Sequence, residues 1–178
     1  GQYRIFNPQT RQDGGSAFGP NVRISDRDLT DGTSNTVGMS EVKAFTPRVH
    51  DALLPLTQPV STVAMAGSIS GGSFAVMGHT EWVCGRAIHT GFTSVFGPNT
   101  VVPYVNGGTS YDIDVCSSRE GASATLATYG VITSRSYHTG GVNSLLMDGS
   151  CRTISSNIDL GTWQSLCQRS DGRVLGDF

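Results

Sequence analysis

The stretch "SRSYHTGGVNSLLMDGSCRTIS", residues 134–155, decides the fold that we predict for this chain. Its segments "VNSLLM" and "SCRTIS" flank Asp148-Gly149. An Asp-Gly link between two strand-like runs is a strong hairpin signal, because both residues of such a two-residue turn adopt positive φ. Thr139-Gly140-Gly141 supplies an earlier turn. We therefore predict a three-stranded meander over residues 126–155.

The same stretch contains a histidine and an aspartate that resemble parts of a catalytic pair. His138 and Asp148 fall at opposite ends of the predicted middle strand. A strand of about six residues spans roughly 20 Å, too far for a hydrogen bond between them. We interpret Asp148 as a turn residue and His138 as a group that satisfies backbone atoms at the preceding turn. Metal binding or proton transfer by His138 is the alternative.

The remaining segments predict a β-rich α+β fold in one domain over residues 1–178. We expect strands at "YRIF", "TVGMSEVKAF", "YDIDVCSS" and "LATYGVITSRSY", and two more strands within residues 80–96 around a turn at Cys84-Gly85. Residues 25–32 predict a brief helix. The Gly- and Ser-rich residues 57–78 predict a long loop or insertion.

The C-terminal part contains the one strong helix signal. In "NIDLGTWQSLCQRSDG", Asp159 is the expected N-cap, and Asp171-Gly172 is the expected end. Leu160, Trp163 and Leu166 share one face, so we expect this short helix to pack on the sheet through Trp163.

Composition excludes some partners. Charged residues make up 15% of the 178 residues and the net charge is -2, which gives no support for binding nucleic acid. A chain rich in Gly and hydroxyl residues suits exported β-proteins. Four cysteines, at 84, 116, 151 and 167, permit two disulfides in such a location, and four free thiols are the equal alternative.

Two sets of side chains are weak candidates for metal ligands. His79, Glu81 and His89 would suit zinc if a hairpin brought them together. Asp112 and Asp114 share a strand face near Glu120 and would suit calcium. In both cases an exposed polar strand face is the simpler interpretation, so we predict no cofactor.

A hydroxyl-rich block near the N-terminus has a structural interpretation. Thr33, Ser34, Asn35 and Thr36 follow Asp31-Gly32 and precede Glu41. We expect these side chains to form a polar clamp that bonds loop backbone beneath the sheet. Contact with a carbohydrate or peptide is the alternative.

Several of these blocks together resemble a bacterial prepilin-like family, catalogued as a domain of unknown function. His138, nine residues and then Asp148-Gly149 is similar to its closing H-x9-D-G signature. The blocks "LTDGTSNTVGMSEVKAF", "GHTEWVCGRAIHTGFTSVFGPNTVVPY" and "DLGTWQSLCQRSDGRVLGDF" resemble further parts of that family. Cys84 is a departure, since the family pattern usually has Asp at that position.

The resemblance implies a non-catalytic structural domain of a prepilin-like protein outside the cytoplasmic membrane. Its partners would be other copies or related pilin-like subunits. The membrane would be contacted only through an N-terminal helix, because the chain corresponds to the C-terminal portion of such a protein. That location leads us to expect the disulfides Cys151–Cys167 and Cys84–Cys116.

Two other functions stay open. An extracellular module that binds glycan or another ligand, with calcium or without it, would need a pocket lined by aromatics such as Trp82, Phe92 and Tyr104. An enzyme would need a histidine, a carboxylate and a nucleophile within hydrogen-bond distance.

Overall fold

The hairpin predicted from the opening stretch is present, and its third strand comes from elsewhere in the chain. In the computed structural model, which describes residues 3–54, 59–120, 122–176 and 178, β10 (Gly141–Leu146) pairs antiparallel with β11 (Cys151–Ser155). On its other side β10 pairs with β3 (Val37–Ser40). Val142, Ser144 and Leu146 alternate inward from β10 and are buried.

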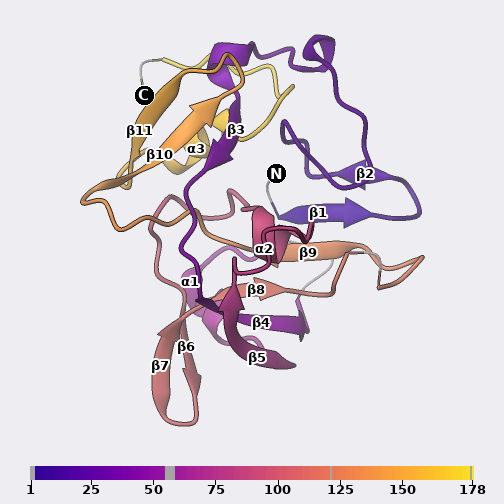
Figure 1. The fold of residues 1–178 in the computed structure, drawn as a ribbon, viewed down its shortest axis with the longest axis vertical. Helices are drawn as coiled ribbons and strands as arrows, with labels where there is room; N and C mark the ends of the chain where they lie inside the picture. Colours follow the sequence, from indigo (N-terminus) through magenta and orange to yellow (C-terminus); the bar gives the residue numbers. More distant parts are fainter. Residues whose placement is uncertain (1–2, 55–58, 121, 177) are drawn as a thin grey trace.

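The predicted meander of residues 126–155 is therefore wrong in one strand. β9 (Thr128–Val131) belongs to a second sheet of six strands, in the order β2-β1-β9-β8-β4-β5. The segment between β9 and β10 crosses from one sheet to the other (Figure 1). This crossing segment carries three buried polar side chains, those of Ser134, Arg135 and Ser136. They donate to the carbonyls of Glu41, Thr133 and Gly141, in that order.

The six-stranded sheet is mainly antiparallel. Its one parallel pair joins β4 to β8, with Val49 opposite Val115. A separate hairpin, β6 with β7, projects from the lower end in Figure 1. The strands not yet bounded are β1 (Arg4–Asn7), β2 (Gln12–Asp13), β4 (Thr46–Ala52), β5 (Gly71–Gly78), β6 (Pro103–Asn106), β7 (Thr109–Asp112) and β8 (Asp114–Cys116).

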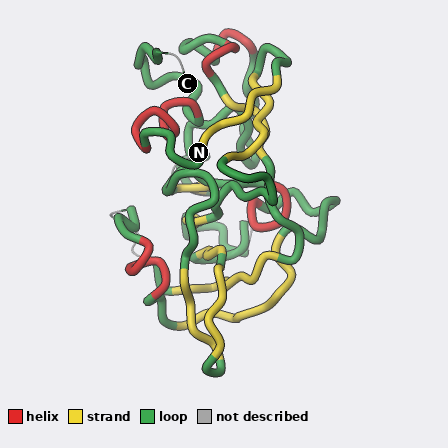
Figure 2. The backbone as a smooth tube through the Cα atoms, turned by 90° about the vertical axis from the view of Figure 1, so that its left-hand side faces the viewer, coloured by secondary structure: helices red, strands yellow, loops and turns green. Residues whose placement is uncertain are grey.

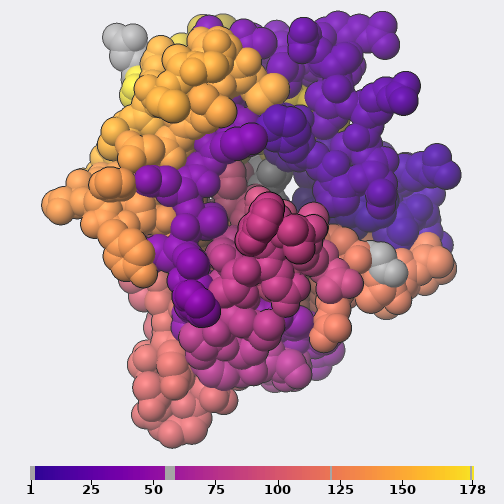
Figure 3. All heavy atoms as spheres, viewed as in Figure 1, coloured from indigo at the N-terminus to yellow at the C-terminus, as the bar shows by residue number. Residues whose placement is uncertain are grey.

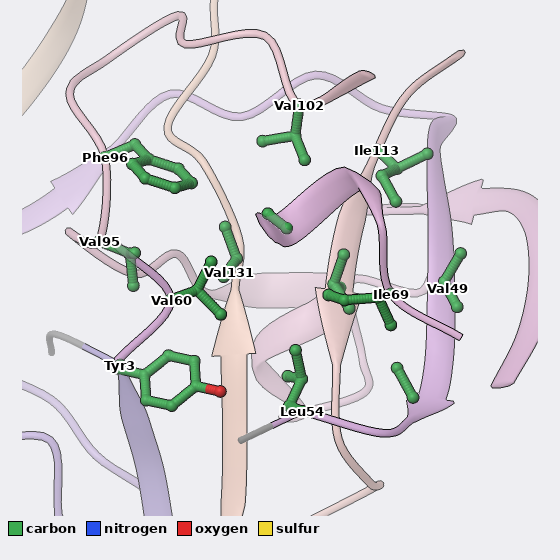
Figure 4. Close-up of a cluster of buried hydrophobic side chains, with 13 residues drawn as sticks. Tyr3, Val49, Leu54, Val60, Ile69, Val95, Phe96, Val102, Ile113 and Val131 are labelled. Atoms are coloured by element: carbon green, nitrogen blue, oxygen red, sulfur yellow. The ribbon is translucent and has the colours of Figure 1, made fainter. Parts of the chain in front are cut away.

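Among the described residues, the core has a large cluster on the six-stranded sheet, a second one under the three-stranded sheet and a small one around Ile5, Ile88 and Ile132. Figure 4 shows the first cluster, in which Val49, Ile113 and Val131 lie among side chains from several strands. The second packs Val37, Val142, Leu146 and Ile154 against the C-terminal helix. Figure 2 shows the two parts one above the other.

The C-terminal helix α3 (Leu160–Leu166) packs on the three-stranded sheet, as predicted. The Asp159 side chain caps it by accepting from the Thr162 amide, and Trp163 and Leu166 are fully buried. The prediction was wrong for Leu160, whose side chain is 42% exposed. It was also wrong for the C-terminal end of the helix, which lies at Leu166 and not near Asp171-Gly172.

The segments predicted as loop and hairpin have other structures. Within residues 57–78, α1 (Val63–Gly67) and the edge strand β5 are regular; residues 57–58 lie outside the described part. Within residues 80–96, a turn closed by the Cys84 amide and the Glu81 carbonyl leads into the short helix α2 (Ala87–Thr90). Trp82 and Val83 are both exposed, because this tight turn replaces an alternating strand.

The remaining short elements are 3-10 turns, η1 (Asp26–Asp28) and η2 (Thr33–Asn35). The predicted brief helix at residues 25–32 is thus a single turn, with Ser25 and Asp28 forming a capping box. In the part of the chain that the structure describes, no helix is long and apolar enough to span a membrane.

Candidate functional site

Glu41 lies where the end of β3 meets β10 and the crossing segment. Its carboxylate accepts the Asn143 amide at 2.8 Å and the Asn143 side-chain amide at 3.2 Å. His138 Nε2 lies 3.1 Å from the same carboxylate. The hydrogen bond from the Asn143 backbone, together with the other two groups, lowers the pKa of Glu41. His138 therefore contacts Glu41, not the backbone of the preceding turn as we had interpreted it.

The backbone of Glu41 makes contacts as extensive as those of its side chain. Its carbonyl accepts from the Arg135 amide at 2.9 Å and from the Ser134 hydroxyl at 3.0 Å. Its amide donates to the Asn143 carbonyl. Glu41 thus joins the end of β3 to β10 and to the crossing segment, and the geometry supports a structural role.

Asp148 and Gly149 form the hairpin turn, but with a different geometry from the one expected. The Gly149 amide donates to the Leu146 carbonyl, and the Leu146 amide donates to the Ser150 carbonyl. Gly149 has φ +86°, whereas Asp148 is not among the residues with positive φ. The loop is thus a three-residue turn ending in a glycine bulge, not a two-residue turn. The Asp148 carboxylate accepts from the Ser150 amide and hydroxyl.

The polar block after Leu29 bonds to the C-terminal segment. Asp31 accepts from the amides of Asp171 and Gly172 at 2.6 and 2.9 Å. Asn35 donates to the Asp31 carbonyl, and Thr36 donates to the carbonyl of Gly32, a glycine with φ +96°. Two of the four side chains of the predicted polar clamp, those of Asn35 and Thr36, thus bond loop backbone.

The predicted calcium ligands instead surround an arginine. Arg135 donates to both Asp112 oxygens at 2.9 Å and to Asp114 Oδ1. His79 Nε2 lies 3.2 Å from Asp114 Oδ2. The third candidate, Glu120, accepts the Ala87 amide. A guanidinium thus lies where a cation would lie between the two aspartates, so the calcium hypothesis is not supported.

Arg135 is the residue that sequence reasoning missed. It is 3% exposed and lies 21 and 23 positions from its two aspartates. The one available signal was a lone cation within the run "GVITSRSY" of a chain with few charges. The periodicity of that run gave no indication of the partners.

The zinc candidates divide between two places. Glu81 and His89 lie together, with Glu81 Oε2 3.5 Å from His89 Nε2. Cys84, which we did not predict as a ligand, completes a group whose ligand atoms lie within 4.8 Å of one another. His79 does not join it, because its ring bonds Asp114 and the His89 carbonyl.

The cysteines form neither predicted disulfide. All four are free, and they differ in surroundings. Cys167 is buried beneath the three-stranded sheet, while Cys151 faces solvent. Burial raises the pKa of the Cys167 thiol to about 12 and that of Cys116 well above its usual value. Buried thiols of this kind are poor nucleophiles and poor ligands.

A cleft lies between the two sheets, where the N-terminal segment, β3 and the end of α2 meet (Figure 3). It has a volume of about 410 Å³ and is lined mainly by apolar groups, among them Phe18, Met39 and Phe92. The other aromatics proposed for a ligand pocket lie elsewhere. Trp82 is 84% exposed, and Tyr104 stacks on Phe74 in the β6–β7 hairpin region.

The chain matches a known protein family over most of its length. A family model described as "Protein of unknown function (DUF1559)" matches residues 1–161, and the chain belongs to that family. This confirms the family resemblance seen in the sequence. Neither a curated protein nor a solved structure matches the chain.

Proposed function

We propose that this chain is a non-catalytic structural domain of a prepilin-like protein, displayed outside the cytoplasm as part of a cell-surface or secreted assembly. The observation that carries the proposal is how the motif side chains are used. Glu41, Asp31 and Asp148 all accept hydrogen bonds from backbone amides. Groups engaged in this way stabilise loops and the hairpin.

The surface is consistent with contacts between copies. Trp82 and Val83 project from the tight turn before α2 and are 84% and 81% exposed. Adjacent exposed apolar side chains of this size are favourable anchors for protein contacts, since large aromatic residues contribute most at interfaces. We therefore assign the Trp82–Val83 turn to contact with a second copy or a related subunit.

An extracellular ligand-binding module is the second candidate, and the cleft between the sheets favours it. A mainly apolar cleft of about 410 Å³ falls within the size range of small-molecule sites. A calcium-dependent form of this function loses its support, because Arg135 bonds the aspartates that would hold the ion.

Cross-linking in cells tests the assembly proposal. The full-length gene is expressed with an epitope tag, and intact cells are treated with an impermeant cross-linker and, separately, with protease. We expect a ladder of cross-linked species and cleavage from outside. Trp82→Ser should shorten the ladder, while Leu126→Ser, an exposed apolar control on another loop, should not.

The opposite results contradict the proposal. Location of the protein in the cytoplasm would contradict display on the cell surface. A wild-type protein that stays monomeric in cells, with the same cross-linking pattern in both variants, would exclude assembly through this turn. Binding of a small apolar probe in the cleft, lost in Phe92→Ala and unaffected by Trp82→Ser, would then favour the ligand-binding alternative.

A further inference from the structure

Glu81, Cys84 and His89 present three different ligand types at one point of the surface. Their ligand atoms lie within 4.8 Å of one another, and the Glu81–His89 pair is 3.5 Å apart. Two ligands of a tetrahedral zinc ion, each about 2.1 Å from it, are separated by about 3.4 Å. The carboxylate and the imidazole already have that spacing, and the thiol needs to approach by about 1 Å.

The His89 imidazole is available to an ion. Its side chain is 2% exposed, and Nδ1 has no hydrogen-bond partner within the described structure. The ring nitrogen that faces the cluster is the other one, Nε2, which lies 3.5 Å from Glu81 Oε2, so an ion held by these side chains would bind Nε2. A neutral imidazole is the form in which histidine binds metals, and histidine nitrogen is a common ligand of zinc.

The surrounding backbone holds the three side chains in place. The Cys84 amide donates to the Glu81 carbonyl at 2.8 Å, and the Thr90 hydroxyl donates to the Cys84 carbonyl at 3.3 Å. His79 Nδ1 lies 3.2 Å from the His89 carbonyl. The turn and α2 are thus joined on both sides of the cluster, so an ion would meet ligands whose backbones are already positioned.

We propose that Glu81, Cys84 and His89 bind a zinc ion through three protein ligands, with the fourth position open to solvent. Thiolate, imidazole and carboxylate together suit zinc better than calcium or magnesium, which prefer oxygen. Cys84 loses its thiol proton to solvent as the ion binds. Glu81 is 46% exposed in its side chain, which leaves a path from solvent to the open position.

Charge around the site balances that of the ion. The Cys84 thiolate and the Glu81 carboxylate together carry two negative charges, which match a divalent cation.

Cobalt(II) absorption is the direct test, because cobalt substitutes for zinc and its thiolate complexes have a charge-transfer band. Tag-free, reduced protein is titrated with Co²⁺ and then with Zn²⁺, and zinc affinity is measured by calorimetry. We expect one ion per chain, a thiolate charge-transfer band, and loss of that band when zinc displaces cobalt.

Cysteine variants give a matched pair. Cys84→Ser should abolish the band and weaken zinc binding by at least about tenfold, since the loss of even an outer-sphere partner has that effect. Cys151→Ser removes the exposed thiol on β11 and should change neither. His89→Gln, with its fold checked by circular dichroism, should weaken binding as Cys84→Ser does.

Three outcomes would overturn the proposal. They are a wild-type chain without the band, a band that survives in Cys84→Ser, and a band lost in Cys151→Ser. None of these depends on whether the Trp82–Val83 turn contacts another copy, so the zinc and assembly proposals fail separately.

Discussion

Asp114 is a buried charged residue in a chain that has few charged residues, and its role is structural. Its side chain is fully buried, and it accepts from the Thr133 amide at 3.0 Å and from Arg135. His79 approaches its other oxygen. Burial alone would raise the pKa of Asp114, but the charge of Arg135 and the contact with His79 outweigh it, so the pKa is lowered. The carboxylate is thus ionised within the core and holds the crossing segment against β8.

Asp114→Asn should be among the most destabilising single changes in the chain. Breaking a buried ion pair by removing one partner costs about 3–5 kcal/mol. In this variant Arg135 keeps only Asp112, whose side chain is 34% exposed, as a charged partner. Urea unfolding followed by circular dichroism measures the loss. Asp26→Asn, at an exposed position, is the control and should change stability by less than about 0.5 kcal/mol. Equal effects for the two variants would show that the Arg135 network contributes little.

The same ion pair gives a pH dependence of defined sign. A carboxyl whose pKa is lowered by folding contributes stability that is present above its unfolded pKa, about 3.9, and is lost as the pH falls through the folded value. The difference between wild type and Asp114→Asn should therefore be full at neutral pH and shrink below about pH 4.

The role of a residue could be predicted when its bonding partner lies close to it in the sequence, and could not when the partner lies far along the chain. Asp148 and Asp159 bond groups two and three residues away, and their turn and cap roles follow from local rules. His138, in contrast, contacts Glu41 across 97 positions. His79 lies 35 positions from Asp114. A pairing over such a distance is set by the topology of the sheets, which local patterns do not specify.

At the scale of elements, the β10–β11 hairpin depends on a single backbone conformation. Gly149 has φ +86°, and a Cβ added there would meet no atom within 4 Å. Any loss of stability on substitution therefore comes from the backbone conformation and not from a steric clash. The hairpin signal in the sequence was correct about the strands and wrong about the loop length, because a three-residue loop with a glycine bulge can also end in an Asp-Gly pair.

Gly149→Val should cost about 1–2 kcal/mol, because a β-branched residue is strained in the left-handed region. Gly149→Asn should cost less, since asparagine adopts that conformation more readily. Thermal unfolding of the two variants distinguishes them. Equal losses for Val and Asn would mean that the positive φ is not what the turn requires.

The helix α3 places one tryptophan at the centre of the second cluster. Trp163 has no exposed surface, and its indole donates to the Phe96 carbonyl at 3.0 Å. Phe92 stacks against it with ring centroids 5.8 Å apart. The apolar spacing predicted this face correctly for Trp163 and Leu166. Leu160 is exposed because it is the first residue of the helix, beside the N-cap.

Trp163→Ala should destabilise the chain by about 3–5 kcal/mol, the usual cost of removing a buried aromatic side chain. Leu160→Ala is the matched control on the same helix and should cost under about 1 kcal/mol, since its side chain is partly exposed. Denaturant unfolding of both variants provides the comparison. A small loss of stability in Trp163→Ala would show that α3 contributes little to the core.

For the whole molecule, the question is whether the two sheets unfold together. The second cluster and the small cluster around Ile5, Ile88 and Ile132 share Phe92 as a packing neighbour. Trp163 of the second cluster bonds Phe96, which belongs to the first. The crossing segment with Arg135 provides a polar link as well. These connections are continuous and largely buried, so we expect one cooperative transition.

Two probes in one chain test that expectation. In a Trp82→Phe background the fluorescence comes from Trp163 alone and reports on the three-stranded sheet, while far-ultraviolet circular dichroism reports on all strands. The two urea transitions should coincide, as they do in two-state unfolding. Phe92→Ala, at a half-buried position between clusters, should lower the free energy of unfolding by about 2–3 kcal/mol and shift both midpoints equally. A fluorescence transition that precedes the dichroism transition would show instead that the three-stranded sheet with α3 unfolds separately, and that Phe92 and Trp163 are contacts at a boundary.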